Sequence, residues 1–177
     1  RIVEGPYETL LAGLRRAEID LLFGALRSPA PVDDILQEHL FNDELVIVAA
    51  PQHPLSQGAA PDFAQAMEFP WVVAIPGTPA RDQFDAHILK SGISLPATLV
   101  ETSSMILMRE LLHKGPYLGV VSRLQAESEI GKGLMTALPL GIAESRRAIG
   151  LTVRANWKPT RIQNEFLDLI RAEFKSR

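Results

Sequence analysis

The chain opens on a pattern in which a strand, an amphipathic helix and a second strand follow one another within the first 26 residues. Ile2 and Val3 are predicted to form the short first strand, and the apolar run 19–24 is predicted to form the second. Two strands joined by a helix of this length are predicted to lie parallel with a right-handed crossover. The helix begins near Pro6, which a first helical turn tolerates, and its apolar face consists of Leu10, Leu11, Leu14 and Ala17.

Strand-like and helix-like segments continue to alternate along the chain, without repeats or low-complexity tracts. The segment 28–34 contains two prolines and is predicted to be a surface connection. Strands are predicted at 45–50, 71–75, 97–100, 117–121, 134–138 and 149–154. Helices are predicted at 62–67 and at 81–90, the second with Phe84, Ile88 and Leu89 inward. Ser103 or Ser104 is predicted to cap the next helix, whose apolar face consists of Leu107, Met108, Leu111 and Leu112. The last helix is predicted at 160–174, with the apolar residues Ile162, Phe166, Leu169, Ile170 and Phe174. The alternation predicts a doubly wound α/β architecture.

Composition narrows the class of protein without identifying it. The chain has 177 residues, of which 46% are apolar, enough for the core of a globular protein. It contains no cysteine, which excludes disulfides and thiolate metal sites and fits a reducing compartment. Its apolar runs are strand-sized, well short of the roughly 20 residues of a membrane-spanning helix, so no membrane partner is expected. The formal net charge is −3 with interspersed signs and no basic stripe, so this piece is not expected to contact DNA itself.

Several runs, in order along the chain, resemble the effector-binding domain of LysR-type transcriptional regulators. The first two are 3–24, which contains Val3-Glu4-Gly5 and ends on Asp20-Leu21-Leu22-Phe23-Gly24, and 44–55, a strand followed by a His-Pro-Leu turn. Later segments agree in sequence order; they are Trp71 to Ala74, Glu101 to Ser104, Gly119 to Ser122 and the helix from Thr160 to Phe174. Each motif is short, and the ordered series supplies the specificity.

The resemblance implies an α/β, two-lobed fold of the type-II periplasmic-binding-protein kind, in which each lobe is a mixed sheet flanked by helices. Lobe one would comprise about 1–46 and 151–177, and lobe two about 47–150, with hinges where the chain crosses between them. The first strand and helix of lobe one, and the amino-terminal winged helix-turn-helix domain, are expected to precede Arg1 and to be absent from this chain.

Candidate ligand contacts arise from helix amino-termini, whose free N–H groups and positive dipole end attract carboxylate or hydroxyl oxygens. Thr78 before Pro79 is a typical cap, and the hydroxyl cluster at 102–104 precedes the next helix. The resemblance places these groups on the cleft wall of lobe two, adds Ser122, and puts the loop 25–28 of lobe one opposite. The predicted ligand residues are Ala25, Arg27, Ser28, Gly77, Thr78, Thr102, Ser103, Ser104 and Ser122. Arg27, and Arg81 and Arg123 in lobe two, are the candidate arginines for pairing with a carboxylate effector. Two alternatives stay open, namely that the hydroxyls only cap helices and that these arginines are solvated at the surface.

Catalytic and metal motifs are missing from the sequence. The four histidines, His39, His53, His87 and His113, lack paired helical spacing, so no metal site is expected, and His53 in its turn is predicted to be structural. Gly131-Lys132-Gly133 lacks the glycine and hydroxyl positions of a phosphate-binding loop. No nucleophile elbow surrounds Ser122, because Val120 and Leu124 occupy its glycine positions. No catalytic residue and no cofactor are predicted.

The resemblance therefore predicts a cytoplasmic, non-enzymatic, ligand-sensing regulatory domain. Its partners would be a small organic acid or sugar-like effector and further copies of itself in a homodimer or tetramer, with DNA bound only by the absent amino-terminal domain. The alternatives are a solute-binding protein of a transport system and an enzyme built on the same two-lobed fold. The segment upstream of Arg1 would separate the first two, being a helix-turn-helix in a regulator and a signal peptide in a transport protein.

Overall fold

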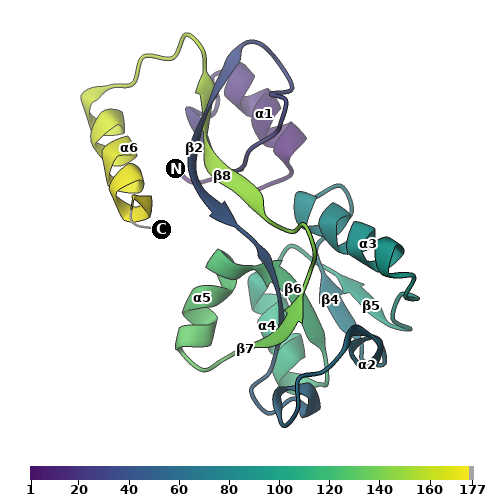
Figure 1. Cartoon of the computed structure of the whole chain (residues 1–177). Helices are drawn as coiled ribbons and strands as arrows, with labels where there is room; N and C mark the ends of the chain where they lie inside the picture. Colours follow the sequence, from purple (N-terminus) through teal and green to yellow (C-terminus); the bar gives the residue numbers. More distant parts are fainter. Residues whose placement is uncertain (176–177) are drawn as a thin grey trace. The chain divides into compact units, whose positions relative to one another are not determined.

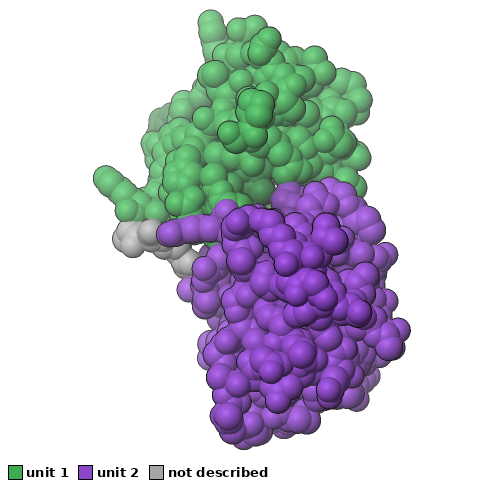
Figure 2. All heavy atoms as spheres, turned by 45° about the vertical axis from the view of Figure 1, so that its right-hand side comes forward, with its two compact units in different colours: residues 1–43, 147–177 green, residues 44–146 purple. Residues whose placement is uncertain are grey.

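The computed structural model describes residues 1–175, which form two compact units. Unit 1 combines residues 1–43 with the chain from residue 147 onward, and unit 2 is the continuous stretch 44–146 (Figures 1 and 2). We expected lobe boundaries near residues 46 and 150. Among the described residues, no helix is both long enough and apolar enough to cross a membrane.

Unit 1 is built on a three-stranded sheet whose central strand comes from the far end of the chain. The strands are β1 (Leu21–Ala25), β8 (Arg147–Arg154) and β2 (Ile35–Asp43), and β8 pairs antiparallel with both neighbours. Helix α1 (Tyr7–Arg15) buries Leu11 and Leu14 against Leu22 and Ile35. The mixed sheet that we expected in each lobe is present in unit 2, whereas this sheet is antiparallel in both pairs.

The predicted parallel strand pair at the start of the chain is wrong. Ile2 and Val3 are exposed and lie outside any strand, and the partner of β1 is β8. The predicted helix ends early, because Ala17 has a left-handed φ of 61° and lies beyond its last residue, Arg15. Local periodicity identified the helix and β1, but the strand that pairs with β1 lies more than 120 residues away in the sequence, beyond the reach of any local pattern.

Strand β2 was not predicted, because its sequence, ILQEHLFND, carries charge at positions that the fold covers. Asp43 is buried and pairs with Arg147 at 3.2 Å between Oδ2 and Nη2. Glu38 accepts two hydrogen bonds from Arg171 of helix α6 (Arg161–Phe174), at 2.8 and 2.7 Å. Ion-pair partners more than 100 residues away thus replace the apolar alternation by which a strand is recognised in sequence.

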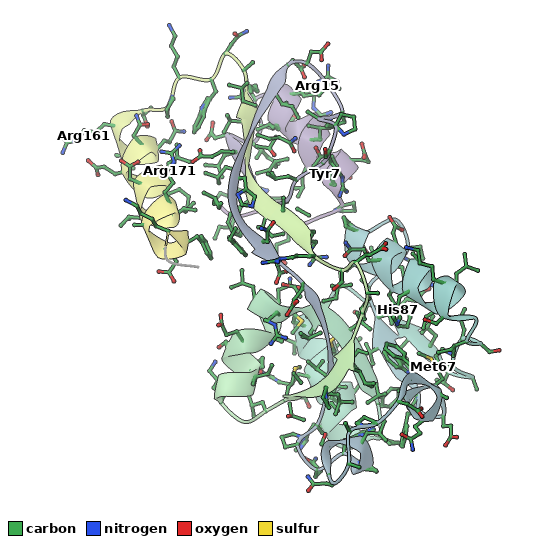
Figure 3. All side chains as sticks on the ribbon, in the orientation of Figure 1. Tyr7, Arg15, Met67, His87, Arg161 and Arg171 are labelled. Atoms are coloured by element: carbon green, nitrogen blue, oxygen red, sulfur yellow. The ribbon has the colours of Figure 1, made fainter. Side chains whose placement is uncertain are left out.

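Helix α6 has a capping box at Thr160 and Gln163, and its bounds agree with the prediction. Only Leu167 of the helix is buried, whereas the apolar side chains Ile162, Phe166 and Leu169 are exposed. Phe174 stacks on Phe41 of β2 with ring centroids 4.4 Å apart. Arg161 and Arg171 are labelled on this helix in Figure 3.

Unit 2 contains a five-stranded mixed sheet in the order β5-β4-β6-β3-β7. Its strands are β3 (Leu45–Ala49), β4 (Trp71–Val73), β5 (Leu99–Glu101), β6 (Leu118–Ser122) and β7 (Thr136–Gly141). β4 runs parallel to both β5 and β6, and β3 runs antiparallel to both β6 and β7. Every residue of β3, β4 and β6 is buried, which explains why the prediction found these three strands as uniformly apolar runs.

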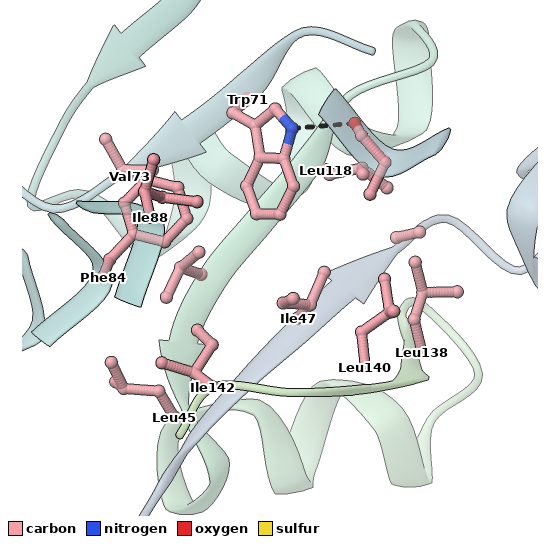
Figure 4. Packing of buried hydrophobic residues seen from close by; sticks show 13 residues of the cluster. Leu45, Ile47, Trp71, Val73, Phe84, Ile88, Leu118, Leu138, Leu140 and Ile142 are labelled. Atoms are coloured by element: carbon pink, nitrogen blue, oxygen red, sulfur yellow. Dashed lines mark hydrogen bonds between the residues drawn. The ribbon is translucent and has the colours of Figure 1, made fainter. Parts of the chain in front are cut away.

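Helices cover both faces of this sheet and form two clusters of buried side chains. Trp71 is the largest fully buried side chain, and its indole N–H donates to the carbonyl of Ala66 at 3.0 Å (Figure 4). The helices are α2 (Phe63–Met67), α3 (Pro79–Ser91), α4 (Met105–Lys114) and α5 (Arg123–Gly131), with a short 3-10 turn, η1, at Pro54–Ser56.

Two expectations about helix faces need correction. Leu89 is 83% exposed rather than inward, because the buried face of α3 is set by Phe84 and Ile88, and the next residue is rotated away from it. Leu107 of α4 is likewise exposed, while Met108 and Leu112 are buried. Helix α5 was not predicted at all; among its residues only Ala126 is buried, so it lacks an apolar stripe.

Candidate functional site

The carboxyl edge of the parallel strands in unit 2 brings three helix amino-termini to one side of the sheet. β4, β5 and β6 are adjacent and parallel, so their carboxyl ends share an edge, and each leads into a helix, α3, α4 or α5 respectively. Open α/β sheets bind ligands outside the carboxyl ends of their strands, where the chain order reverses. Here β4 lies between β5 and β6, so the chain passes from β4 to β5 on one side and then to β6 on the other, and its order reverses at β4.

The first of these helix ends is held by Thr78. Its Oγ1 accepts from the Arg81 N–H at 3.4 Å and donates to the Ile75 carbonyl at 2.8 Å. Gly77 precedes it with a φ of +79°, a left-handed backbone conformation that residues other than glycine rarely adopt. Pro79 then occupies the first helical position, as the sequence predicts.

The second helix end carries the hydroxyls of residues 102 to 104. Ser104 is the cap, because its Oγ accepts from the Leu107 N–H at 3.2 Å. Thr102 Oγ1 accepts from the Ser104 N–H at 3.0 Å, and the Thr102 N–H donates to the Val73 carbonyl at 2.9 Å. Ser103 is exposed, and its hydroxyl has no hydrogen-bond partner within the described chain. It is therefore the hydroxyl of this group that is free to meet a ligand.

The third helix end belongs to Ser122. This residue closes β6, caps α5 by accepting from the Gln125 N–H at 3.3 Å, and is buried. Because the residue is buried, its hydroxyl caps the helix and is poorly accessible to a ligand.

Arg81 is committed to the protein rather than free for a ligand. Its side chain is 11% exposed; Nε donates to both carboxylate oxygens of Asp85, at 2.8 and 2.9 Å, and Nη1 donates to Glu101 Oε1 at 2.5 Å. Nη1 also donates to the carbonyl of Ala74 at 3.3 Å. The hydrogen bond with Glu101 raises the pKa of the Arg81 guanidinium, so its charge is permanent. The single Arg81 guanidinium is therefore shared between two carboxylates, those of Asp85 and Glu101.

In unit 1, the predicted ligand residues lie in and after strand β1. Ala25 ends the strand, and Ser28 is exposed. The Gln37 side-chain amide fixes the backbone of Arg27, accepting from its N–H at 3.0 Å and donating to its carbonyl at 2.8 Å. The Arg27 guanidinium lies 4.4 Å from the ring centroid of Tyr7, a cation–π contact. Burial raises the pKa of the Tyr7 phenol, which Figure 3 marks on α1.

The remaining charged candidates have structural roles or lie at the surface. Arg123 forms an exposed ion pair with Glu44 at 2.7 Å. His53 is buried; its Nδ1 accepts from the Leu55 N–H at 3.1 Å, and Nε2 lies 3.3 Å from the Pro116 carbonyl. Burial lowers the pKa of His53, with an opposing contribution from Pro116. Within residues 1–175, no group of three His, Asp or Glu side chains is arranged to hold a metal ion.

The structure thus brings Gly77, Thr78, Thr102, Ser103, Ser104 and Ser122 to one sheet edge of unit 2, and keeps Ala25, Arg27 and Ser28 together in unit 1. Sequence reasoning missed Tyr7 and Gln37 as partners of Arg27, and Glu101 as the partner of Arg81. None of these pairs has the spacing of a helix or a strand, so nothing in the sequence indicated that the two residues are in contact. Only Arg81 and Asp85, four residues apart on a helix, carried a readable signal.

Comparison with known proteins gives one consistent family. Residues 1–175 match the family model described as LysR substrate binding domain. The chain is similar to the HTH-type transcriptional regulator GalR of Pseudomonas putida (strain KT2440), with 33% identity over 152 residues, which are 86% of this chain and 38% of that protein. It spans about two fifths to one half of the length of the curated relatives that it matches.

Solved structures show the same fold. The regulatory domain of CcmR from Synechocystis PCC6803, in complex with 2-PG, aligns with a TM-score of 0.76 at 18% identity, covering 96% of this chain and 80% of that one. The effector-binding domain of QuiR, in complex with shikimate, aligns with a TM-score of 0.74 at 18% identity, covering 98% of this chain and 80% of that one. The α/β periplasmic-binding-protein-like fold expected from the sequence is confirmed.

Proposed function

The chain belongs to the LysR substrate-binding domain family, and from that membership we propose that it is the ligand-sensing domain of a LysR-type transcription regulator. It binds a small polar metabolite and does not transform it. The relatives that it matches are named as transcriptional regulators, which agrees with a regulatory role rather than an enzymatic one.

One observation carries this proposal, the convergence of three capped helix amino-termini at the carboxyl edge of β5, β4 and β6. Free N–H groups and the positive ends of the helix dipoles favour a carboxylate or hydroxyl oxygen at that edge. The exposed hydroxyl of Ser103 supplies a further donor or acceptor. An organic acid or a sugar-like molecule has the oxygen atoms that such an edge binds.

The effector is proposed to contact both units, with Ala25, Arg27 and Ser28 contributing from unit 1. The complexes of CcmR with 2-PG and of QuiR with shikimate support a small-molecule ligand for this fold. Binding would favour one arrangement of the units and pass that preference through a homodimer or tetramer to DNA-binding domains elsewhere in the protein. Allosteric couplings of this kind typically amount to roughly 1–3 kcal/mol. We propose that the protein acts in the cytoplasm.

A thermal-shift screen against small organic acids and sugars tests the proposal. A ligand at about one hundred times its Kd should stabilise the chain by roughly 2.7 kcal/mol, a rise of several degrees in Tm. Ser103→Ala should weaken the binding of an identified ligand by about 1 kcal/mol, because it removes one hydrogen bond and leaves the helix cap intact. Conversion of that ligand to a product, or salt-sensitive binding of duplex DNA by this chain alone, would contradict the proposal.

A further inference from the structure

Two connections leave the carboxyl edge of unit 2 from the neighbouring parallel strands β4 and β5. The last register partners of this strand pair are Val73 and Glu101. Directly after them, the Thr102 N–H donates to the Val73 carbonyl at 2.9 Å. Beyond this bond the two connections separate, one leading to Thr78 at the start of α3 and the other to Ser104 at the start of α4.

Arg81 joins the two connections at the point where they separate. Its Nη1 donates to the carbonyl of Ala74 at 3.3 Å and to Glu101 Oε1 at 2.5 Å. One nitrogen atom thus ties the first residue after β4 to the last residue of β5. The backbone N–H of Arg81 is also the group that donates to Thr78 Oγ1, so the same residue belongs to the amino-terminus of α3.

Asp85, one turn later on α3, fixes the direction of the Arg81 guanidinium. Both of its carboxylate oxygens accept from Arg81 Nε, at 2.8 and 2.9 Å. The guanidinium is therefore held between partners on three segments, which are α3, the end of β5 and the connection that follows β4. Its planar set of donors suits this arrangement, which the single ammonium of a lysine cannot reproduce.

Glu101 is followed directly by the hydroxyl group cluster of the candidate site. Thr102 Oγ1 accepts from the Ser104 N–H at 3.0 Å, and Ser104 Oγ caps α4. The exposed Ser103 lies between these two residues. A restraint on Glu101 therefore restrains the amino-terminus of α4 through a short, hydrogen-bonded stretch of chain.

We propose that Arg81 is a positioning residue of the effector site, whose guanidinium fixes the amino-termini of α3 and α4 relative to each other. The proposal rests on the proposed function, because it takes both helix ends to contact the effector. A site whose groups are already in place loses less conformational entropy when it binds. Removal of the guanidinium should therefore weaken binding, although Arg81 acts through the helix ends and not by contact with the effector.

Amide hydrogen exchange of the chain without ligand tests the positioning directly. Arg81→Met keeps an unbranched side chain and removes every donor, and it should accelerate exchange of the Thr102 and Ser104 amides about tenfold or more. Arg109→Met is the matched control, because Arg109 pairs with Glu129 of α5 from the middle of α4, and it should leave both rates within about twofold of the parent. The amides of the buried strand β3 report global stability. Equal acceleration in β3, or none at Thr102 and Ser104, would overturn the proposal.

A second measurement uses acetate, the smallest stable carboxylate probe, in an NMR titration of the ¹⁵N-labelled chain. Arg81→Met and Glu101→Met should each weaken acetate binding about fivefold or more. The second variant separates positioning from charge, because it removes a negative charge, and a role through charge alone predicts tighter binding of an anion. The double variant should bind acetate within about twofold of the weaker single variant, since both substitutions remove the same interaction.

The two measurements fail independently of each other. Tighter acetate binding by Glu101→Met, or additive losses in the double variant, would overturn the positioning role. An acetate titration that leaves the parent spectrum unchanged would count against the proposed function of this edge. The exchange rates would then still decide the role of Arg81, because they are measured without a ligand.

Discussion

Gly150 determines how closely strands β8 and β2 approach each other. A Cβ at this position would overlap the carbonyl oxygen of Glu38, which belongs to the backbone and cannot move aside as a side chain would. Gly24, its register partner on β1, has open space where a Cβ would be.

We therefore predict that Gly150→Ala destabilises the chain by about 3 kcal/mol or more, as strained core substitutions do. Gly24→Ala is the matched control and should be neutral or stabilising by about 0.5 kcal/mol, because alanine loses less backbone entropy than glycine in a strand. Urea denaturation measures both. Equal effects of the two substitutions would show that β2 can yield at this point.

His53 gives unit 2 a pH-dependent stability whose sign is fixed by its pKa. Burial holds the pKa of the folded state below the ordinary value of 6.5, so the unfolded chain takes up a proton first as the pH falls. The contribution is complete above pH 6.5 and is lost as the pH falls through the folded-state pKa. The free energy of unfolding should therefore be smaller at pH 5.5 than at pH 7.5.

The matched variant for this prediction is His53→Asn, whose Oδ1 can still accept from the Leu55 N–H but does not titrate. It should be less stable than the parent at pH 7.5, because it loses the ring contact with Phe69. Its loss of stability between pH 7.5 and pH 5.5 should be smaller than that of the parent. A variant with the full parental pH dependence would assign the effect to other groups.

Among the secondary-structure elements, α4 separates the two roles that a hydroxyl near a helix end can have. Ser104 caps the helix, whereas Ser103 is exposed without a partner in the described chain. Ser104→Ala should lower the free energy of unfolding by about 1 kcal/mol, and Ser103→Ala should leave it unchanged within about 0.5 kcal/mol. Thermal and urea unfolding in the absence of ligand would measure this difference. Equal losses in both variants would mean that the two hydroxyls share the cap.

The elements that the sequence predicted well are those whose signals are local. Thr78 and Thr160 cap their helices because a hydroxyl three residues before a free N–H is a short-range arrangement, and β3 was visible as an unbroken apolar run. Strand β2 and helix α5 were missed because neither carries such a signal. Charges of β2 are satisfied by Arg147 and Arg171, and α5 buries a single alanine.

In the candidate site, too, the residues with local sequence signals could be predicted and the partners distant in sequence could not. The hydroxyls of residues 78 and 102–104 could be named from helix-start patterns, although which of Ser103 and Ser104 forms the cap required the structure. The partners of the two arginines could not be named. Tyr7 reaches Arg27, and Glu101 reaches Arg81, across twenty residues in each case, which only the folded chain brings together.

At the scale of the whole molecule, unit 1 is assembled from two segments of the sequence, whereas unit 2 is continuous. Unit 2 is one continuous stretch, 44–146, with its own sheet and core. We predict that this fragment folds alone, with a cooperative transition and a free energy of unfolding of about 5 kcal/mol. Trp71, fully buried there, reports folding by its blue-shifted fluorescence. The peptide 1–43 is the control and should show no transition; a fragment 44–146 that unfolds without cooperativity would contradict the prediction.

The central position of β8 between β1 and β2 also has a consequence for the order in which the protein forms during synthesis. The first 43 residues leave the ribosome without the strand that joins their two sheet segments, and wait until residues 147–154 have been made. Unit 2 emerges in between and can fold first, since domains generally fold as units during translation. Until then β1 and β2 are unpaired edges, open to mispairing with other nascent chains, and slow translation of residues 44–154 would lengthen that exposure.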